Sequence, residues 1–320
     1  MTTIMWFDRP VTDLAPDELG SLLGDRIRAG GPDLDQLAIA SAAIAGGSRW
    51  DGPMFDRAPG LQVVARVGIG VDSVDLDEAT RRGVAVTNTP DGPTVSTAEH
   101  AVALMFSVTK TIGVHQQRRR DATGGYAASS TAVELDGLTL GLVGYGRIAR
   151  RVARIARAVG MTVLATDPAL DAGSLAADDE LVELVDLDRL TARADVISLH
   201  CPLLPTTERL FDTDRFDRCR RGVVLINAAR GGVVDHDALL AALDDGRVAG
   251  AGLDVTDPEP LPADHPLLHR DDVVVTGHVA SSTVVGRRRM LTMAIGQARM
   301  VLEGARPTWL VNPDVWDRRR

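Results

Sequence analysis

Short apolar runs alternate with helical patterns along almost the whole chain, and this alternation restricts the possible folds more than any other feature of the sequence. In the second half most of these runs are apolar on both faces, as in strands that helices cover from both sides. Such an alternation is typical of α/β proteins with parallel sheets. A chain of 320 residues is long enough for two domains of this kind.

The period of the apolar residues predicts the individual elements. In the first half we expect strands at 3–7, 42–45, 61–67 and 84–89, and helices at 16–27 and 75–83. One long helix is expected from about 94 to 120, followed by a Gly-, Ala- and Ser-rich connection at 121–132. Further strands are expected at 139–144, 161–167, 195–201, 222–228, 249–255 and 272–278, before a last helix at 284–302.

Composition narrows the class of protein. A formal net charge of −9 argues against nucleic acid as the main partner. The two cysteines, Cys201 and Cys219, lack metal-ligand spacing, so we expect no metal site and a reduced, cytoplasmic protein. The first residues do not resemble a signal peptide, and no apolar run approaches the ~20 residues of a membrane span, so no membrane partner is expected.

The segment G-Y-G-R-I-A, from Gly144 to Ala149, lies between a predicted strand and a predicted helix. This is the alanine variant of the G-x-G-x-x-G dinucleotide fingerprint. Gly144 permits the tight turn, Gly146 lets the backbone approach a pyrophosphate, and Ala149 lets helix and strand pack closely. We expect the helix start, with Arg147 and Ile148, to lie against the phosphates, although a plain surface position is the alternative for Arg147.

The next predicted strand ends at Asp167, 21 residues beyond Gly146. A carboxylate there can accept hydrogen bonds from both ribose hydroxyls and repels a 2'-phosphate. The sequence therefore predicts NAD in preference to NADP.

Three polar side chains follow three of the later strands: Arg230, Glu259 and His278. The carboxyl ends of parallel strands meet at one edge, where ligands bind, so we expect the three groups close together. A guanidinium can bind a carboxylate through two hydrogen bonds, an imidazole can exchange a proton, and a carboxylate can orient the imidazole. Each residue alone could be a surface or turn residue, but their joint placement favours hydride chemistry on an oxo acid.

These motifs make the chain resemble the D-isomer-specific 2-hydroxyacid dehydrogenases over nearly its whole length. "NAARGGVVDHDAL", "LDVTDPEP" and "TGHVASST" resemble the family's segments around its arginine, glutamate and histidine. The resemblance implies that Arg230 binds the substrate, that His278 is the acid/base, and that Glu259 is its partner. It also implies that the loop in "VGIGVDSVD" binds the substrate carboxylate through the backbone of Ile69 and Gly70.

The resemblance further implies cofactor-binding residues and an architecture. The additional cofactor residues are Thr97, Cys201, Pro202, Thr207, Ala228 and Asp254. The implied fold has a Rossmann NAD domain at 98–282, inserted into a flavodoxin-like substrate domain at 1–97 and 283–320. Both domains are doubly wound parallel sheets, and the family is commonly dimeric, so a homodimer is expected.

Some positions depart from the family pattern. Gly277 stands where proline usually precedes the histidine, and Tyr126 stands where tryptophan is frequent. "GGSRW", at 46–50, replaces an Arg-Ser-x-Thr-Lys pattern of many phosphoglycerate dehydrogenases, which argues against 3-phosphoglycerate as substrate, although Arg49 or Arg66 could bind a phosphate.

The expected activity is the NAD-dependent interconversion of a small (R)-2-hydroxy acid and a 2-oxo acid. The sequence leaves open whether that acid is 3-phosphoglycerate, glyoxylate, hydroxypyruvate or another. Two alternatives are an NAD(H)-sensing corepressor or scaffold on the same fold, and an enzyme resembling phosphite dehydrogenase.

Overall fold

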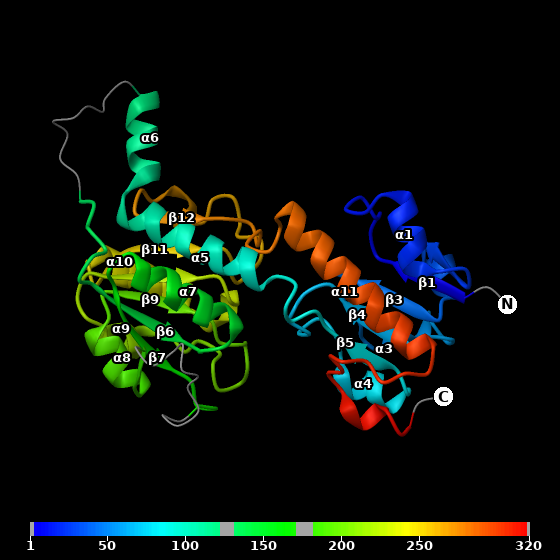
Figure 1. Cartoon of the computed structure of the whole chain (residues 1–320). Coiled ribbons are helices and arrows are strands. Elements are labelled where there is room, and N and C mark those ends of the chain that lie inside the picture. The colour runs from blue at the N-terminus through cyan, green and yellow to red at the C-terminus, as the bar shows by residue number, and fades with distance from the viewer. Residues whose placement is uncertain (1–2, 122–130, 171–181, 319–320) are drawn as a thin grey trace. The chain divides into compact units, whose positions relative to one another are not determined.

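The structure is a computed structural model that describes residues 3–121, 131–170 and 182–318 (Figure 1). The chain divides into two compact units, unit 1 with Met1–Pro93 and Ser282–Arg320 and unit 2 with Thr94–Ser281. Unit 2 is thus an insertion in the chain of unit 1. The boundaries expected from the sequence, after 97 and after 282, lie four residues and one residue further along the chain. The assignment of unit 1 to substrate stays a prediction.

Unit 1 is built on a parallel sheet of five strands in the order β2-β1-β3-β4-β5. The strands are β1 (Thr3–Phe7), β2 (Ile27–Gly30), β3 (Ala42–Ala45), β4 (Val63–Arg66) and β5 (Ala85–Thr87). The helices are α1 (Pro16–Leu23), α2 (Leu34–Leu37), α3 (Gly52–Asp56), α4 (Leu76–Arg81) and α11 (Val284–Leu302). This order is the flavodoxin-like one, as the sequence predicted.

Two apolar clusters cover the two faces of this sheet. Met5 and Phe7 of β1 belong to one cluster and Trp6 to the other, because successive side chains of a strand point to opposite faces. Helix α11 contributes Leu291 and Ile295 to the first cluster, so the C-terminal segment is part of the core of unit 1.

Unit 2 contains a parallel sheet of seven strands in the order β12-β11-β10-β9-β6-β7-β8. The strands are β6 (Thr139–Val143), β7 (Thr162–Thr166), β8 (Val182–Leu184), β9 (Val196–Leu199), β10 (Val223–Asn227), β11 (Val248–Leu253) and β12 (Val273–Val275). The helices are α5 (Thr94–Thr109), α6 (Ile112–Arg120), α7 (Arg147–Ala158), α8 (Leu187–Arg193), α9 (Thr213–Arg218) and α10 (His236–Asp244). The direction of winding reverses between β6 and β9, which is the switch point of a doubly wound dinucleotide-binding sheet.

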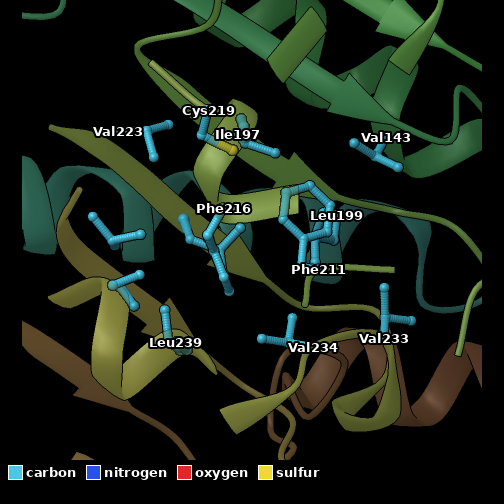
Figure 2. Packing of buried hydrophobic residues seen from close by; sticks show 14 of the residues in the cluster. Val143, Ile197, Leu199, Phe211, Phe216, Cys219, Val223, Val233, Val234 and Leu239 are labelled. Carbon is cyan, nitrogen blue, oxygen red and sulfur yellow. The ribbon is translucent and has the colours of Figure 1, made fainter. Parts of the chain in front are cut away.

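Each face of the second sheet also has its own core. Helices α5 and α7 lie on one face, where Leu104 and Met105 pack with Val152. On the other face, the rings of Phe211 and Phe216 pack at a tilt with their centroids 5.8 Å apart, in the cluster that also holds Ile197 and Leu199 (Figure 2). Unit 2 is therefore a three-layer sandwich, with its strand ends fixed by burial on both sides.

The structure differs from the sequence prediction in the long helix at 94–120. The helix is interrupted at Lys110 and Thr111, where Thr111 has a φ of +51°. The reason is burial: α5 has a buried face, whereas α6 buries none of its residues, so no continuous apolar stripe holds the two in one line.

Two short strands were not predicted, for local reasons. Strand β2 falls partly within the predicted helix at 16–27, because α1 ends at Gly24, whose φ of +70° stops the helix. Strand β8, at 182–184, is an edge strand with only one fully buried residue, so its sequence shows little pattern.

The C-terminal segment of unit 1 is joined to the sheet by Asn312. Its Oδ1 accepts from the Val86 N–H at 2.8 Å, and its Nδ2 donates to the Val84 carbonyl and the Thr80 hydroxyl, both at 3.0 Å. Asn312 is 6% exposed, so these backbone groups have little access to bulk water. The side chain thus forms hydrogen bonds that the outer side of the edge strand β5 would otherwise lack.

We predict that Asn312→Ala lowers the free energy of unfolding of unit 1 by about 2–4 kcal/mol, since it leaves buried backbone groups unpaired. All four tryptophans lie in unit 1, so denaturant titration followed by tryptophan fluorescence reports on this unit. Asp314→Ala, at an exposed neighbouring position, is the control. Equal midpoints for both variants would contradict the role given to Asn312.

Candidate active site

The fingerprint turn of unit 2 has the geometry that the sequence predicted. Gly144 follows β6 with a φ of +85°, and its N–H donates to the Thr166 carbonyl at 2.8 Å. A Cβ on Gly144 would lie 2.8 Å from the backbone of His200 and Cys201, so the turn passes directly beside the end of β9. Both the φ angle and the close approach require glycine here.

The start of α7 suits an anion. Gly146 is the N-cap of this twelve-residue helix and supplies no capping side chain, so the first-turn N–H groups are not satisfied by a cap. A Cβ built on Gly146 meets no atom within 4 Å, so there is open space beside the helix start. Arg147 is exposed and Ile148 half-buried at the same turn. A pyrophosphate fits these features.

Asp167 lies directly after β7, beside the fingerprint. Its Oδ2 accepts from the Tyr145 N–H at 2.9 Å, and its Oδ1 accepts from the Ala169 N–H at 3.0 Å. The carboxylate is therefore held against the turn by a backbone hydrogen bond. The role that the sequence predicted for this carboxylate, accepting from the ribose hydroxyls, stays a prediction.

Several of the other predicted cofactor residues are more buried than the start of α7. Thr207 closes the loop after β9, since its hydroxyl donates to the Pro202 carbonyl at 2.6 Å and accepts from the Leu204 N–H at 2.8 Å. Cys201 and Thr97 are buried and Ala228 is half-buried. Burial raises the pKa of the Cys201 thiol to about 11, so it is a neutral group at physiological pH.

Arg230 lies beyond the end of β10, next to the segment that follows β11. The adjacent Gly231 is indispensable to this arrangement, because a Cβ there would lie 2.0 Å from the backbone of Thr256. The Arg230 carbonyl accepts from the Asn227 side chain at 2.9 Å, and its Nη1 donates to the Ala229 carbonyl at 2.7 Å. The backbone of the arginine segment is thus packed on the loop that leads to Glu259.

Glu259 and His278 are brought together as the sequence predicted. Glu259 Oε1 lies 2.6 Å from His278 Nδ1, and both side chains are about half exposed, at 41% and 48%. A carboxylate can only accept, so Nδ1 carries a proton and donates it, which leaves Nε2 as the second reactive nitrogen. β10, β11 and β12 are neighbours in the sheet, so Arg230, Glu259 and His278 follow three adjacent strand ends.

The backbone of His278 adopts a rarely populated conformation, with a φ of +54°. Three successive N–H groups hold it there by donating to Asp254: His278 N to the carbonyl at 2.7 Å, Val279 N to Oδ1 at 2.9 Å, and Ala280 N to Oδ2 at 2.9 Å. Thr276 Oγ1 also donates to Oδ1 at 2.6 Å. We call Asp254 with these donors the Asp254 clamp.

The Asp254 clamp was not predicted from the sequence. The expected role of Asp254 was to hold the nicotinamide carboxamide, and that role stays a prediction, but the carboxylate is 1% exposed and already accepts from Thr276, Val279 and Ala280. The clamp also bears on Gly277, whose missing side chain leaves open space. The N–H groups after residue 277 fix the loop, so it does not depend on a proline there. The other unusual position, Tyr126, lies outside the described residues.

Ile69 and Gly70 lie in unit 1, in the loop after β4. Arg66 shapes this loop: its guanidinium donates to the carbonyls of Gly70 at 3.1 Å, Ala45 at 2.8 Å and Gly46 at 2.6 Å. The Ile69 carbonyl accepts from the Asn88 amide at 2.8 Å. Among the described residues, the hydrogen bonds of this loop engage the carbonyls of Ile69 and Gly70 and not their N–H groups.

The possible phosphate ligands of unit 1 are differently placed. Arg66 donates from Nε and Nη1 to the three backbone carbonyls. Arg49 is 84% exposed, with its guanidinium 3.5 Å from Asp51. Arg49 and Arg66 share no partner in these contacts, so the contacts do not define one position at which both would bind the same anion.

Comparison with known proteins gives the family. Residues 102–280 match the model of the D-isomer specific 2-hydroxyacid dehydrogenase NAD-binding domain. The chain belongs to this family. The NAD-binding domain lies within unit 2, and NAD is therefore the cofactor, in agreement with the fit of the fingerprint turn.

Relatives of this dehydrogenase family resemble the chain along most of its length. It is 42% identical over 234 residues, 73% of its length, to D-3-phosphoglycerate dehydrogenase of Archaeoglobus fulgidus, but spans only 44% of that protein. It is 38% identical over 272 residues to glyoxylate reductase of Thermofilum pendens, covering 83% of this chain and 79% of that one. The solved structure of TT0316 protein from Thermus thermophilus has 37% identity and a TM-score of 0.86, covering 97% of this chain and 100% of that one.

The described ranges contain neither a group of metal-binding side chains nor a membrane-spanning helix. No three His, Cys, Asp or Glu side chains there are grouped so that they could hold a metal ion. No helix in the same ranges is long and apolar enough to cross a bilayer.

The Asp254 clamp predicts a specific acid sensitivity. Burial raises the pKa of the Asp254 carboxyl, but the hydrogen bonds from His100, Thr276, Ala280 and Val279 outweigh burial and lower it to about 2, from an ordinary 3.8. The ionised form therefore stabilises the folded state above pH ~4, and that contribution is lost as the pH falls towards 2.

We predict that Asp254→Asn is less stable than the parent protein at pH 6 by about 2 kcal/mol or more, and that the difference narrows at pH 3. Urea unfolding followed by circular dichroism measures both values, and tryptophan fluorescence identifies the contribution of unit 1. Exposed Asp237→Asn is the control. A stability difference that stays constant between pH 6 and pH 3 would show that the carboxylate is not held in its ionised form.

Proposed function

We propose that the chain is an NAD-dependent oxidoreductase that interconverts a (R)-2-hydroxy acid and a 2-oxo acid. The observation that carries the proposal is the 2.6 Å hydrogen bond between Glu259 and His278 at the carboxyl edge of the NAD-binding sheet, where Arg230 follows a strand two places away from the strand before His278. When bound, the nicotinamide supplies or accepts the hydride. What the chain must supply is a proton, a grip on the substrate carboxylate and a polarised carbonyl.

His278 moves the proton in this proposal. With Nδ1–H bound to Glu259, its Nε2 can donate to the carbonyl oxygen during reduction or accept from the hydroxyl during oxidation. Glu259 accepts from Nδ1–H and so fixes the tautomer and the orientation of the ring. The Asp254 clamp keeps the histidine backbone in its rare conformation, so the imidazole does not have to find its position in each turnover.

Arg230 binds the substrate carboxylate in this proposal. A planar guanidinium can form two parallel hydrogen bonds to a carboxylate, which fixes the orientation as well as the position of the acid. In unit 1, we propose that the N–H groups of Ile69 and Gly70 bind a carboxylate oxygen. The support for this is that the carbonyls of the same loop are already held by Arg66 and Asn88.

The remaining cofactor contacts are also proposals. Gly144, Gly146, Arg147 and Ile148 would surround the pyrophosphate, and Asp167 the ribose, where its charge selects NAD against NADP. Thr97, Cys201, Pro202, Thr207, Ala228 and Asp254 would line the rest of the NAD site. The environment of Arg66 favours a non-phosphorylated acid over 3-phosphoglycerate, because that guanidinium already holds three carbonyls.

We further propose a cytoplasmic homodimer. The family resemblance supports the dimer, and light scattering on the purified chain tests it. Both cysteines are buried free thiols, which is consistent with a reducing compartment.

We predict that His278→Ala lowers kcat for a responsive 2-oxo acid by roughly 10²–10⁴-fold, the usual effect of losing a positioned proton donor. The dissociation constant for NADH, followed by its own fluorescence, should stay within a few-fold. The assay uses a panel containing glyoxylate, hydroxypyruvate and larger 2-oxo acids, each with NADH and NADPH, together with phosphite and NAD. His269→Ala, an exposed histidine of unit 2, is the control.

The panel also tests the alternatives to this function. A cofactor-sensing scaffold would bind NADH and turn over none of the acids, and an enzyme resembling phosphite dehydrogenase would reduce NAD only with phosphite. Normal turnover in His278→Ala would exclude the proposed proton transfer.

We predict that Arg230→Lys raises KM for the oxo acid and also lowers kcat. Lysine keeps the charge but loses the two-pronged hydrogen bond, and a misplacement of about 1 Å can cost ~10²-fold in rate. NADH affinity should change little, because the pyrophosphate is expected at Gly144–Ile148. Arg218→Lys on the surface is the control. Loss of NADH binding with an unchanged KM would make Arg230 a cofactor residue instead.

A further inference from the structure

His100 extends the Asp254 clamp to helix α5. Its Nε2 lies 3.0 Å from Thr276 Oγ1 and 3.3 Å from Asp254 Oδ1. The imidazole is 23% exposed, whereas the Asp254 side chain is 1% exposed, so His100 closes the clamp on its outer side. His100, Thr276 and Asp254 all belong to unit 2. Helix α5 packs on the sheet of that unit, and the loop with His278 follows strand β12 of the same sheet.

The hydrogen bonds determine where the protons are. Thr276 Oγ1 has one proton, and the 2.6 Å contact with an ionised Asp254 requires that proton to point at Oδ1. The hydroxyl oxygen can then only accept from His100, so Nε2 of His100 carries a proton. The chain of donors therefore runs from His100 through Thr276 to Asp254, and from the N–H groups of the histidine loop to the same carboxylate.

This direction of donation has a consequence for His278. The carboxylate Oδ1 receives both the Thr276 hydroxyl and the Val279 N–H, so a change in its orientation moves the peptide next to His278. The hydrogen bonds of the His100 and Thr276 side chains go to each other and to Asp254, so both residues act on His278 through that carboxylate. The rare φ of +54° makes the loop dependent on such restraints, because the conformation is not favoured by the residue itself.

We propose that His100 is a positioning residue of the proposed active site: it orients the Asp254 carboxylate, directly and through Thr276, and thereby sets the position of the His278 imidazole. The inference rests on the proposed function, in which His278 transfers the proton. It assigns a role to a histidine that the sequence pattern marked only as part of the helix at 94–120.

A positioning role for His100 differs from a role in stabilising the fold. Removing the Nε2 donor should loosen the peptide groups of His278, Val279 and Ala280, while the fingerprint turn, which follows a strand four places away from β12 in the sheet, stays as it is. Chemistry should slow far more than NADH affinity weakens, because Asp254 is only one of the proposed NAD contacts. A general loss of packing around α5 would instead affect stability and NADH binding together.

The test compares His100→Leu, which removes the donor, with His100→Gln, whose amide nitrogen can reach the position of Nε2. His269→Leu, an exposed histidine of the same unit, is the control. The measurements are kcat for the best 2-oxo acid, the NADH dissociation constant, the isotope effect on kcat with deuterated NADH, and hydrogen exchange of the peptide that spans 276–281.

For His100→Leu we expect kcat to fall about 10–100-fold, the scale of a misplaced catalytic group. The isotope effect should rise, exchange at 278–280 should accelerate, and the NADH dissociation constant should stay within about two-fold. His100→Gln should recover most of kcat and of the protection from exchange. This pattern would establish the positioning role.

Three results would overturn it: unchanged kcat in His100→Leu, equal loss in the leucine and glutamine variants, or weaker NADH binding in proportion to the loss of kcat. If the parent protein reduces no 2-oxo acid, the proposed function fails instead. The exchange comparison then decides the inference alone, since unchanged exchange at 278–280 in His100→Leu would refute the link between His100 and the loop.

Discussion

Three consecutive peptide N–H groups, those of His278, Val279 and Ala280, converge on Asp254, which lies just beyond the end of the neighbouring strand β11. A buried carboxylate without partners would be strongly unfavourable, and a histidine at a φ of +54° would be unfavourable without restraint. The hydrogen bonds between Asp254 and these N–H groups offset both costs. The position of the imidazole, and with it the proposed proton transfer, depends on the hydrogen bonds between this charge and this strained turn.

The sheet topology places the remaining chemistry around this point. Parallel strands send all their carboxyl ends to one edge, so Arg230, Glu259 and His278 follow adjacent strand ends at that edge although they are far apart in the chain. The reversal of winding between β6 and β9 creates the separate position at which Gly144 and Gly146 can receive the pyrophosphate. One sheet thus carries the proposed cofactor position at its switch point and the proposed reactive side chains towards its β12 edge.

The exposed and the buried parts of the proposed site have different roles. Glu259 and His278 are about half exposed, so the imidazole proposed to transfer the proton is open to a ligand. Asp254 lies buried behind the loop, where low dielectric strengthens its hydrogen bonds, and the partly buried Thr276 donates to it. His100 lies at the border between the two, partly exposed on α5, which is why a change there can alter the loop without removing the core of unit 2.

The sequence alone determined the α/β class, the two parallel sheets and the fingerprint turn, because periodicity and the glycines at 144 and 146 are local properties. It also predicted the pairing of Glu259 with His278, since strand ends share an edge. Only the tertiary structure decided the break at Thr111, the commitment of Arg66 to three carbonyls, and the partners of Asp254. Those contacts join residues such as His100, Asp254 and Ala280 that are distant in the chain, and no local pattern records which buried donor will satisfy which buried acceptor.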